Sequence, residues 1–231
     1  MPARNVVKIY FENGFYHVYN RGVEKREIFI DIQDYVVFLG ILKKYLTPTP
    51  TTNNPTQIKP LIPNTLHDEI DLLAYCLMPN HFHMMIQQKK IDSMTKLLQR
   101  VSTTYSIYFN KKYQRVGSLF QGAYKAVTID DENYLLHLSR YIHLNSLDLL
   151  KVSPSEGSPS EGETLDDYRW SSYPEYIGKR KTEWVKTDLI LSYFSSAKSS
   201  NLNLKDLNTY QNFVEEYPTE AREILGNLAL E

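Results

Sequence analysis

The sequence contains little cysteine and no long apolar run. Cys76 is the only cysteine among 231 residues, so no disulfide can form within the chain, and a reducing compartment such as the cytoplasm is expected. The longest apolar stretches, such as residues 35–42 and 72–78, are much shorter than the roughly 20 residues of a membrane-spanning helix. Residues 1–13 lack the apolar segment of a signal peptide. These absences predict a cytoplasmic protein without a membrane anchor.

Acidic side chains are also absent from residues 93–126, although the whole chain has a formal net charge of only -1. The basic residues of this stretch are Lys96, Arg100, Lys111, Lys112, Arg115 and Lys125. The aromatic residues among them are Tyr105, Tyr108, Phe109, Tyr113, Phe120 and Tyr124. Because cations attract phosphates and aromatic rings stack on bases, this stretch is a candidate nucleic-acid-binding surface. The alternative is a helix with a solvated basic face and a buried aromatic face.

Two segments have the composition of loops. Residues 47–65 are rich in Pro, Thr and Asn, and residues 153–163 contain SPSEG twice in succession. Neither segment can contribute much to a hydrophobic core. The sequence therefore predicts a main domain over residues 1–150, a low-complexity linker over 151–169 and a C-terminal helical appendage over 170–231.

The order of elements in the main domain is typical of an α+β fold. Hydrophobic patterns predict strands at residues 15–20, 71–78, 81–87 and 120–128, and helices at residues 34–45 and 93–112. This order is that of the ferredoxin-like split βαβ arrangement, an antiparallel sheet with helices on one face. An added helix, capped by Asp130 or Asp131, would run to about Asn145. Short helices are expected in the C-terminal appendage at residues 188–195 and 204–217.

Two pairs of residues could carry chemistry. His81 and His83 lie two apart in a predicted strand, so their imidazoles project from one face while Phe82 points into the core. Tyr141 and Asn145 lie four apart in the added helix and share one face. Together they could hold a divalent metal beside a phenol that attacks phosphorus. The alternative from spacing alone is a pair of ordinary strand histidines and a packed tyrosine.

Four short strings, taken together and in order, resemble a known family. They are HVYNRG at residues 17–22, MPNHFH at 78–83, FQGAYK at 120–125 and YIHLN at 141–145. The strings are similar to those of the HUH single-tyrosine transposases, and most similar to the branch called REP-associated tyrosine transposases. The resemblance covers roughly residues 10–150, and WSSY at 170–173 is similar to a segment that follows the domain in that branch.

The resemblance implies a DNA transposase that cleaves and rejoins single-stranded or hairpin DNA in transposition or recombination. Tyr141 matches the nucleophile, which forms a covalent 5′-phosphotyrosine. His81, His83 and Asn145 match the ligands of a divalent metal, Mg²⁺ or Mn²⁺. Arg21 matches a family motif and joins the six basic residues above as a candidate DNA contact. The sequence leaves open whether the chain acts as a monomer or as a homodimer.

Two other functions fit parts of the same pattern. One is a DNA-binding regulator that has the fold but little strand-transfer activity. The other is a zinc hydrolase in which His81, His83 and a third ligand, His137 or Asp71, bind zinc. Zinc-bound water would be the nucleophile of that hydrolase, so its activity would not need Tyr141.

Overall fold

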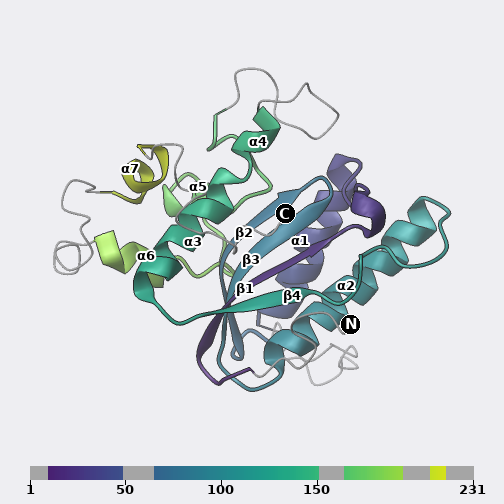
Figure 1. Cartoon of the computed structure of the whole chain (residues 1–231), viewed down its shortest axis with the longest axis horizontal. Helices are drawn as coiled ribbons and strands as arrows, with labels where there is room; N and C mark the ends of the chain where they lie inside the picture. Colours follow the sequence, from purple (N-terminus) through teal and green to yellow (C-terminus); the bar gives the residue numbers. More distant parts are fainter. Residues whose placement is uncertain (1–9, 49–64, 151–163, 195–208, 217–231) are drawn as a thin grey trace, which may run out of the picture.

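A four-stranded antiparallel sheet forms the centre of the computed structural model, which describes residues 10–48, 65–150, 164–194 and 209–216 (Figure 1). The strands are β1 (Gly14–Arg21), β2 (Ile70–Met78), β3 (His81–Gln88) and β4 (Lys125–Ile129). They lie in the order β2-β3-β1-β4. One helix connects β1 to β2 and another connects β3 to β4, as in the ferredoxin-like arrangement. The predicted α+β fold is confirmed.

The three longest helices cover opposite faces of this sheet (Figure 1). They are α1 (Ile32–Leu46), α2 (Ser93–Lys112) and α3 (Glu132–Leu144). The ring of Phe38 in α1 lies 5.4 Å from that of Phe82 in β3 and 5.0 Å from that of Tyr105 in α2. The ring of Tyr141 in α3 instead lies 5.6 Å from that of His83. Because adjacent residues of a strand point to opposite faces, α1 and α2 pack on one face and α3 on the other.

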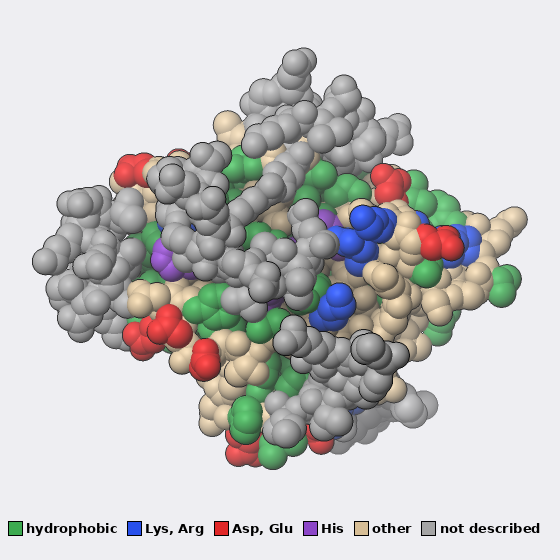
Figure 2. Space-filling model, in the orientation of Figure 1, with side chains coloured by type: hydrophobic (Ala, Val, Ile, Leu, Met, Phe, Trp, Pro, Cys, Tyr) green, Lys and Arg blue, Asp and Glu red, His purple; other side chains and the backbone are tan. Residues whose placement is uncertain are grey.

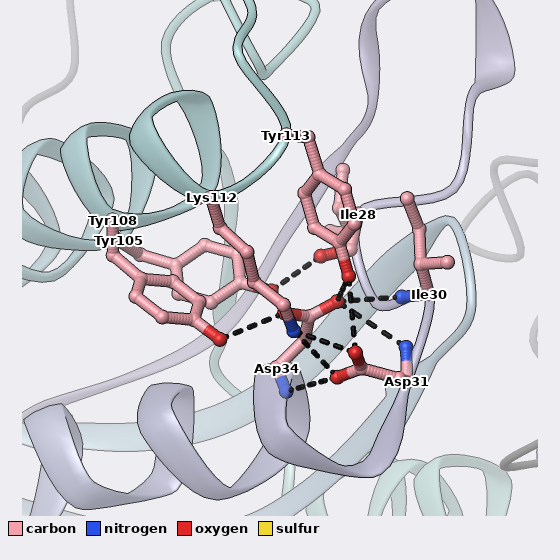
Figure 3. Close-up of polar contacts among 8 residues, drawn as sticks. All are labelled: Ile28, Ile30, Asp31, Asp34, Tyr105, Tyr108, Lys112 and Tyr113. Atoms are coloured by element: carbon pink, nitrogen blue, oxygen red, sulfur yellow. Dashed lines mark hydrogen bonds and ion pairs between the residues drawn. The ribbon is translucent and has the colours of Figure 1, made fainter.

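A buried carboxylate joins the start of α1 to the end of α2 (Figure 3). Asp31 and Asp34 form a capping box at the N-terminus of α1. Asp34 is fully buried and accepts hydrogen bonds from Lys112 at 2.8 Å, Tyr113 at 2.8 Å and Tyr108 at 3.0 Å. These three residues come from the C-terminal end of α2 or directly follow it. Their contacts fix the two helices against each other on the same face of the sheet.

The helix α3 begins at a capped N-terminus and is amphipathic. Asp131 is the N-cap, and its side chain accepts a hydrogen bond from the backbone N–H of Tyr134 at 2.8 Å, as the sequence predicted. Leu135, Leu138 and Ile142 are buried at the spacing of one helix face. Among the residues that the structure describes, no helix is long and apolar enough to cross a membrane.

The described C-terminal residues pack against β2 and α3. Their helices are α5 (Tyr173–Tyr176), α6 (Asp188–Leu191) and α7 (Tyr210–Glu215), with a 3-10 helix at Ser192–Phe194. Earlier in the chain, a 3-10 helix at Val23–Lys25 follows β1, and α4 (Leu147–Leu150) follows α3. The carbonyl of Trp170 accepts the backbone N–H of Leu77 at 2.9 Å, and the Trp170 ring stacks 4.6 Å from Tyr35. Tyr210 contacts His143 of α3, with its hydroxyl 2.7 Å from Nδ1. These residues therefore extend the core of the main domain.

Two parts of the C-terminal prediction can be compared with the structure. The helix predicted at residues 188–195 is seen as α6 and the 3-10 turn after it. Only Tyr210–Glu215 is helical within the described part of the segment 204–217. Residues 151–163, most of the predicted linker, lie outside the described residues, so the domain boundaries stay predictions.

The fourth strand is shorter than the sequence predicted. Residues 120–128 were expected to be extended, but β4 covers Lys125–Ile129 and only an isolated bridge between Gly22 and Phe120 precedes it. Between the bridge and the strand, the side-chain amide of Asn20 donates to the carbonyl of Gly122 at 3.1 Å. The carbonyl of Gly122 thus accepts from the Asn20 side chain, whereas in a longer strand it would accept from a backbone N–H.

Asp34 is expected to contribute strongly to stability. Asp34→Asn removes one of the two negative charges that Lys112 faces and one acceptor oxygen, so buried donors lose partners. We expect the free energy of unfolding in urea to fall by about 2 to 3 kcal/mol. The exposed Asp130→Asn variant is the control and should change it by less than about 0.5 kcal/mol. Equal effects of the two substitutions would contradict a central role for Asp34.

Candidate active site

Two neighbouring strands present a row of polar side chains to the face that α3 covers. In the register of β1 with β3, Tyr19 lies opposite His83 and Arg21 lies opposite His81. Residues directly opposite each other in antiparallel strands project from the same face. His17 precedes Tyr19 by two residues and therefore shares this face. The sheet thus gathers His81 and His83 as the sequence predicted, and it adds side chains from β1.

Each of the two predicted ligand histidines is held through its Nδ1 atom. Nδ1 of His81 lies 2.6 Å from the side-chain oxygen of Asn80, and Nδ1 of His83 lies 2.8 Å from Nε2 of His17. The Nε2 atoms of His81 and His83 are buried and have no hydrogen-bond partner in the described part of the chain. Buried polar atoms are usually paired, so these two nitrogens are the groups that a ligand would satisfy.

Burial keeps these imidazoles neutral. Desolvation, with a smaller contribution from the positive charge of Arg21, lowers the pKa of His81 to about 4. Desolvation and the neighbouring His17, His81 and Arg21 lower the pKa of His83 well below its ordinary value. The pKa of His17 is lowered by burial to about 3. A metal binds only the neutral form of imidazole, and at neutral pH both His81 and His83 are in that form.

The last turn of α3 brings Tyr141 over the histidines. The ring of Tyr141 is half-buried and lies edge-on to His83, at 5.6 Å and 84°. Asn145 is the C-cap of α3 and is 5% exposed. Its side-chain nitrogen donates to the carbonyl of Tyr141 at 2.8 Å, so its amide oxygen is the atom that would coordinate a cation. Tyr141 and Asn145 are thus joined by this hydrogen bond at the end of the helix that packs beside His83.

The donor set suits a hard or borderline divalent cation. Two imidazole nitrogens with one amide oxygen suit Mn²⁺, and Mg²⁺ also accepts such oxygen ligands. Across the described ranges, no three His, Cys, Asp or Glu side chains are grouped so that they could share a metal ion. His137 and Asp71, the alternative third ligands for zinc, are therefore not grouped with His81 and His83 in the described ranges. Asp71 in addition pairs with Lys89 at 2.8 Å.

Two of the seven predicted DNA-contacting residues lie on the same face as this site. Arg21 lies opposite His81, and Lys125 of β4 lies opposite Tyr19 with its ammonium 5.7 Å from the Tyr19 ring centre. Figure 2 shows Lys and Arg side chains beside a histidine near the middle of the viewed face. The structure therefore brings positive charge close to Tyr141.

The other five predicted contacts belong to α2 or directly follow it, and α2 packs on the opposite face of the sheet. They are Lys96, Arg100, Lys111, Lys112 and Arg115. Lys112 is paired with Asp31 and Asp34, and the Arg100 guanidinium lies 5.5 Å from the Tyr45 ring centre. The aromatic residues Tyr105 and Phe109 are buried and cannot stack on bases. The structure thus shows a helix whose basic residues flank a largely buried aromatic face. This is the alternative to a nucleic-acid-binding surface that the sequence left open.

His17 is the site residue that the sequence reasoning missed. It lies in the HVYNRG string, where histidine, tyrosine and arginine alternate with residues of the other face. That period of two was the available signal. Its partner His83 lies 66 residues away, however, and the pairing follows only from the register of β1 with β3.

Residues 43–145 match the family model described as transposase, IS200-like. Within this segment the chain is similar to the IS200-like transposases. The matched residues include His81, His83, Tyr141 and Asn145, while β1 precedes the matched segment. A search of curated proteins found no match.

Among solved structures, the fold is similar to that of a REP-associated tyrosine transposase bound to a REP hairpin. The TM-score is 0.53 at 11% sequence identity, and the alignment covers 79% of this chain and 97% of that chain. A putative transposase from Deinococcus radiodurans R1 aligns with a TM-score of 0.37 and 12% identity, over 60% of this chain and 95% of that chain. The first of these matches supports the fold.

Proposed function

We propose that this transposase cleaves and rejoins single-stranded or hairpin DNA with Tyr141 as the nucleophile and a divalent metal as cofactor. His81, His83 and Asn145 would hold Mg²⁺ or Mn²⁺. The observation that carries the proposal is the pair of buried, unpaired Nε2 atoms beside a half-buried tyrosine. A cation at this place supplies positive charge to phosphate oxygens and polarises the phosphorus atom.

The residues of the site fit a transesterification. The Tyr141 oxygen would attack phosphorus and give up its proton, while the bond from phosphorus to the 3′ oxygen breaks and that oxygen gains a proton. The products are a 5′-phosphotyrosine and a free 3′ hydroxyl. One phosphoester bond forms for each one that breaks, so a 3′ hydroxyl can reverse the reaction and join strands without ATP.

Substrate binding would use the positive charge on the α3 face. Arg21 and Lys125 lie on the same face of the sheet as His81 and Tyr141, where a phosphate next to the nucleophile would be. A hairpin is the proposed substrate because the structural relative with the same fold is bound to a REP hairpin. A single-stranded segment at the cut leaves its backbone accessible to the half-buried phenol.

Removal of either ligand histidine is expected to abolish metal-dependent cleavage. His81→Ala and His83→Ala each delete one of few protein ligands, so Mn²⁺ binding and cleavage of a hairpin-bearing single strand should fall at least about a hundredfold. The fold should persist, as judged by circular dichroism. His67→Ala, outside the site, is the matched control. Full cleavage in excess chelator would contradict the metal requirement.

Tyr141→Phe is expected to abolish cleavage and the covalent intermediate together. The substitution removes one oxygen and keeps the ring, so packing beside His83 and binding of DNA should hardly change. Wild-type protein incubated with an end-labelled hairpin strand should give an adduct that survives denaturing electrophoresis, and the variant should give none.

Other outcomes of that experiment identify the alternatives. Binding without an adduct in the wild-type protein indicates a DNA-binding regulator. Cleavage without an adduct that persists in Tyr141→Phe indicates a water nucleophile and refutes the proposed mechanism. Tyr19→Phe, whose ring also lies on the site face, is the control for loss of a nearby phenol and should retain the adduct.

The two sides of the sheet should differ in their contribution to DNA binding. Arg21→Ala removes a charge beside the site, so we expect weaker binding to a hairpin strand and a salt dependence whose slope falls by about 0.7. Lys96→Ala removes an exposed charge from α2 on the other face and should leave both affinity and slope nearly unchanged. A larger effect of Lys96→Ala, measured by fluorescence anisotropy over a range of salt concentrations, would place the DNA on the α2 side.

A further inference from the structure

His17 and Asn80 have corresponding positions in the site, because each contacts the Nδ1 atom of one predicted ligand histidine. Asn80 contacts Nδ1 of His81, and His17 contacts Nδ1 of His83. His17 is 1% exposed and His83 is 3% exposed, and their rings stack at 5.1 Å and 21°. The contact between them is therefore buried and fixed in orientation.

The proton in each contact determines what the far side of the ring can do. The side-chain oxygen of Asn80 can only accept, so His81 donates from Nδ1 and its Nε2 keeps a lone pair. The contact between His17 and His83 permits two arrangements. If His17 accepts, Nε2 of His83 keeps a lone pair; if His17 donates, Nε2 of His83 carries a hydrogen and cannot bind a metal.

We propose that His17 is a positioning residue that accepts a hydrogen bond from Nδ1 of His83 and so holds Nε2 of His83 ready to bind metal. This inference rests on the proposed function, because it assigns a role toward the same metal. His17 acts through His83. The Nδ1 atom of His17 is buried and has no partner in the described part of the chain. No contact of Nδ1 therefore fixes the tautomer of His17.

Two substitutions separate this role from simple packing. His17→Gln places an amide oxygen near the position of Nε2 and can still accept from His83. His17→Phe fills the same space but offers no acceptor. If His17 accepts a hydrogen bond from His83, His17→Phe should lower the affinity for Mn²⁺ by about ten- to a hundredfold, as is usual for loss of an outer partner of a metal-bound histidine. The affinity of His17→Gln for Mn²⁺ should remain within a few-fold of that of the wild type.

The measurement is a titration of the purified full chain with Mn²⁺ alone, followed by the electron paramagnetic resonance signal of free Mn²⁺. Thermal melting checks that each variant folds, and His17→Leu replaces His17→Phe if the latter shows no cooperative transition. The yield of covalent adduct with a hairpin strand is a second readout, expected to follow the same order of wild type, Gln and Phe.

The outcomes distinguish this inference from the proposed function. If His17→Phe binds Mn²⁺ like the wild type, or if His17→Gln binds Mn²⁺ more weakly than His17→Phe does, His17 only packs and the inference is overturned. In that case a loss of Mn²⁺ binding in His83→Ala would still support the proposed site. If wild type and His83→Ala bind Mn²⁺ equally, both the proposed metal site and the role of His17 are overturned.

Discussion

The alternation of side chains along β3 determines on which face of the sheet the hydrophobic core and the polar site lie. Phe82 points to the face of α1 and α2, where its ring contacts Phe38, while His81 and His83 point to α3. A shift of one residue in the register of β3 would turn both histidines toward the aromatic rings of α1 and α2 and would turn Phe82 toward α3. Burial of Phe82 in the hydrophobic core therefore fixes the face on which the histidines stand, so the same packing that stabilises the fold positions the polar site.

The helix α3 is held from two sides, by the sheet and by the described C-terminal residues. Its buried side chains include His143, whose Nε2 lies 2.8 Å from the hydroxyl of Ser172 and whose Nδ1 contacts Tyr210. Arg140 donates to the carbonyl of Phe213 at 3.0 Å and lies over its ring. Tyr141 projects from the same helix toward the sheet. The described C-terminal residues thus help to set the orientation of α3.

Local periodicity predicted the parts of the site that lie within one element. The spacing of His81 and His83 in a strand, and of Tyr141 and Asn145 in a helix, placed each pair on one face, and the order of elements gave the ferredoxin-like fold. Contacts set by the pairing of distant strands were not predictable in this way. The partnership of His17 with His83 depends on the register of β1 with β3, and the face on which α2 packs depends on the whole sheet. The basic residues of α2 and Lys125 are close in sequence, but they lie on different sides of the protein.

The end of α3 at the site has an electrostatic consequence for the DNA. The backbone dipoles of a helix leave partial negative charge at its C-terminus, and Tyr141 and Asn145 belong to the last turn and C-cap of α3. That field attracts a cation and repels a phosphate. The opposing positive charge then has to come from the strands, where Arg21 and Lys125 are located. A DNA backbone entering the site would therefore be held between a repelling helix end and an attracting sheet, and this polarity would orient it before any bond changes.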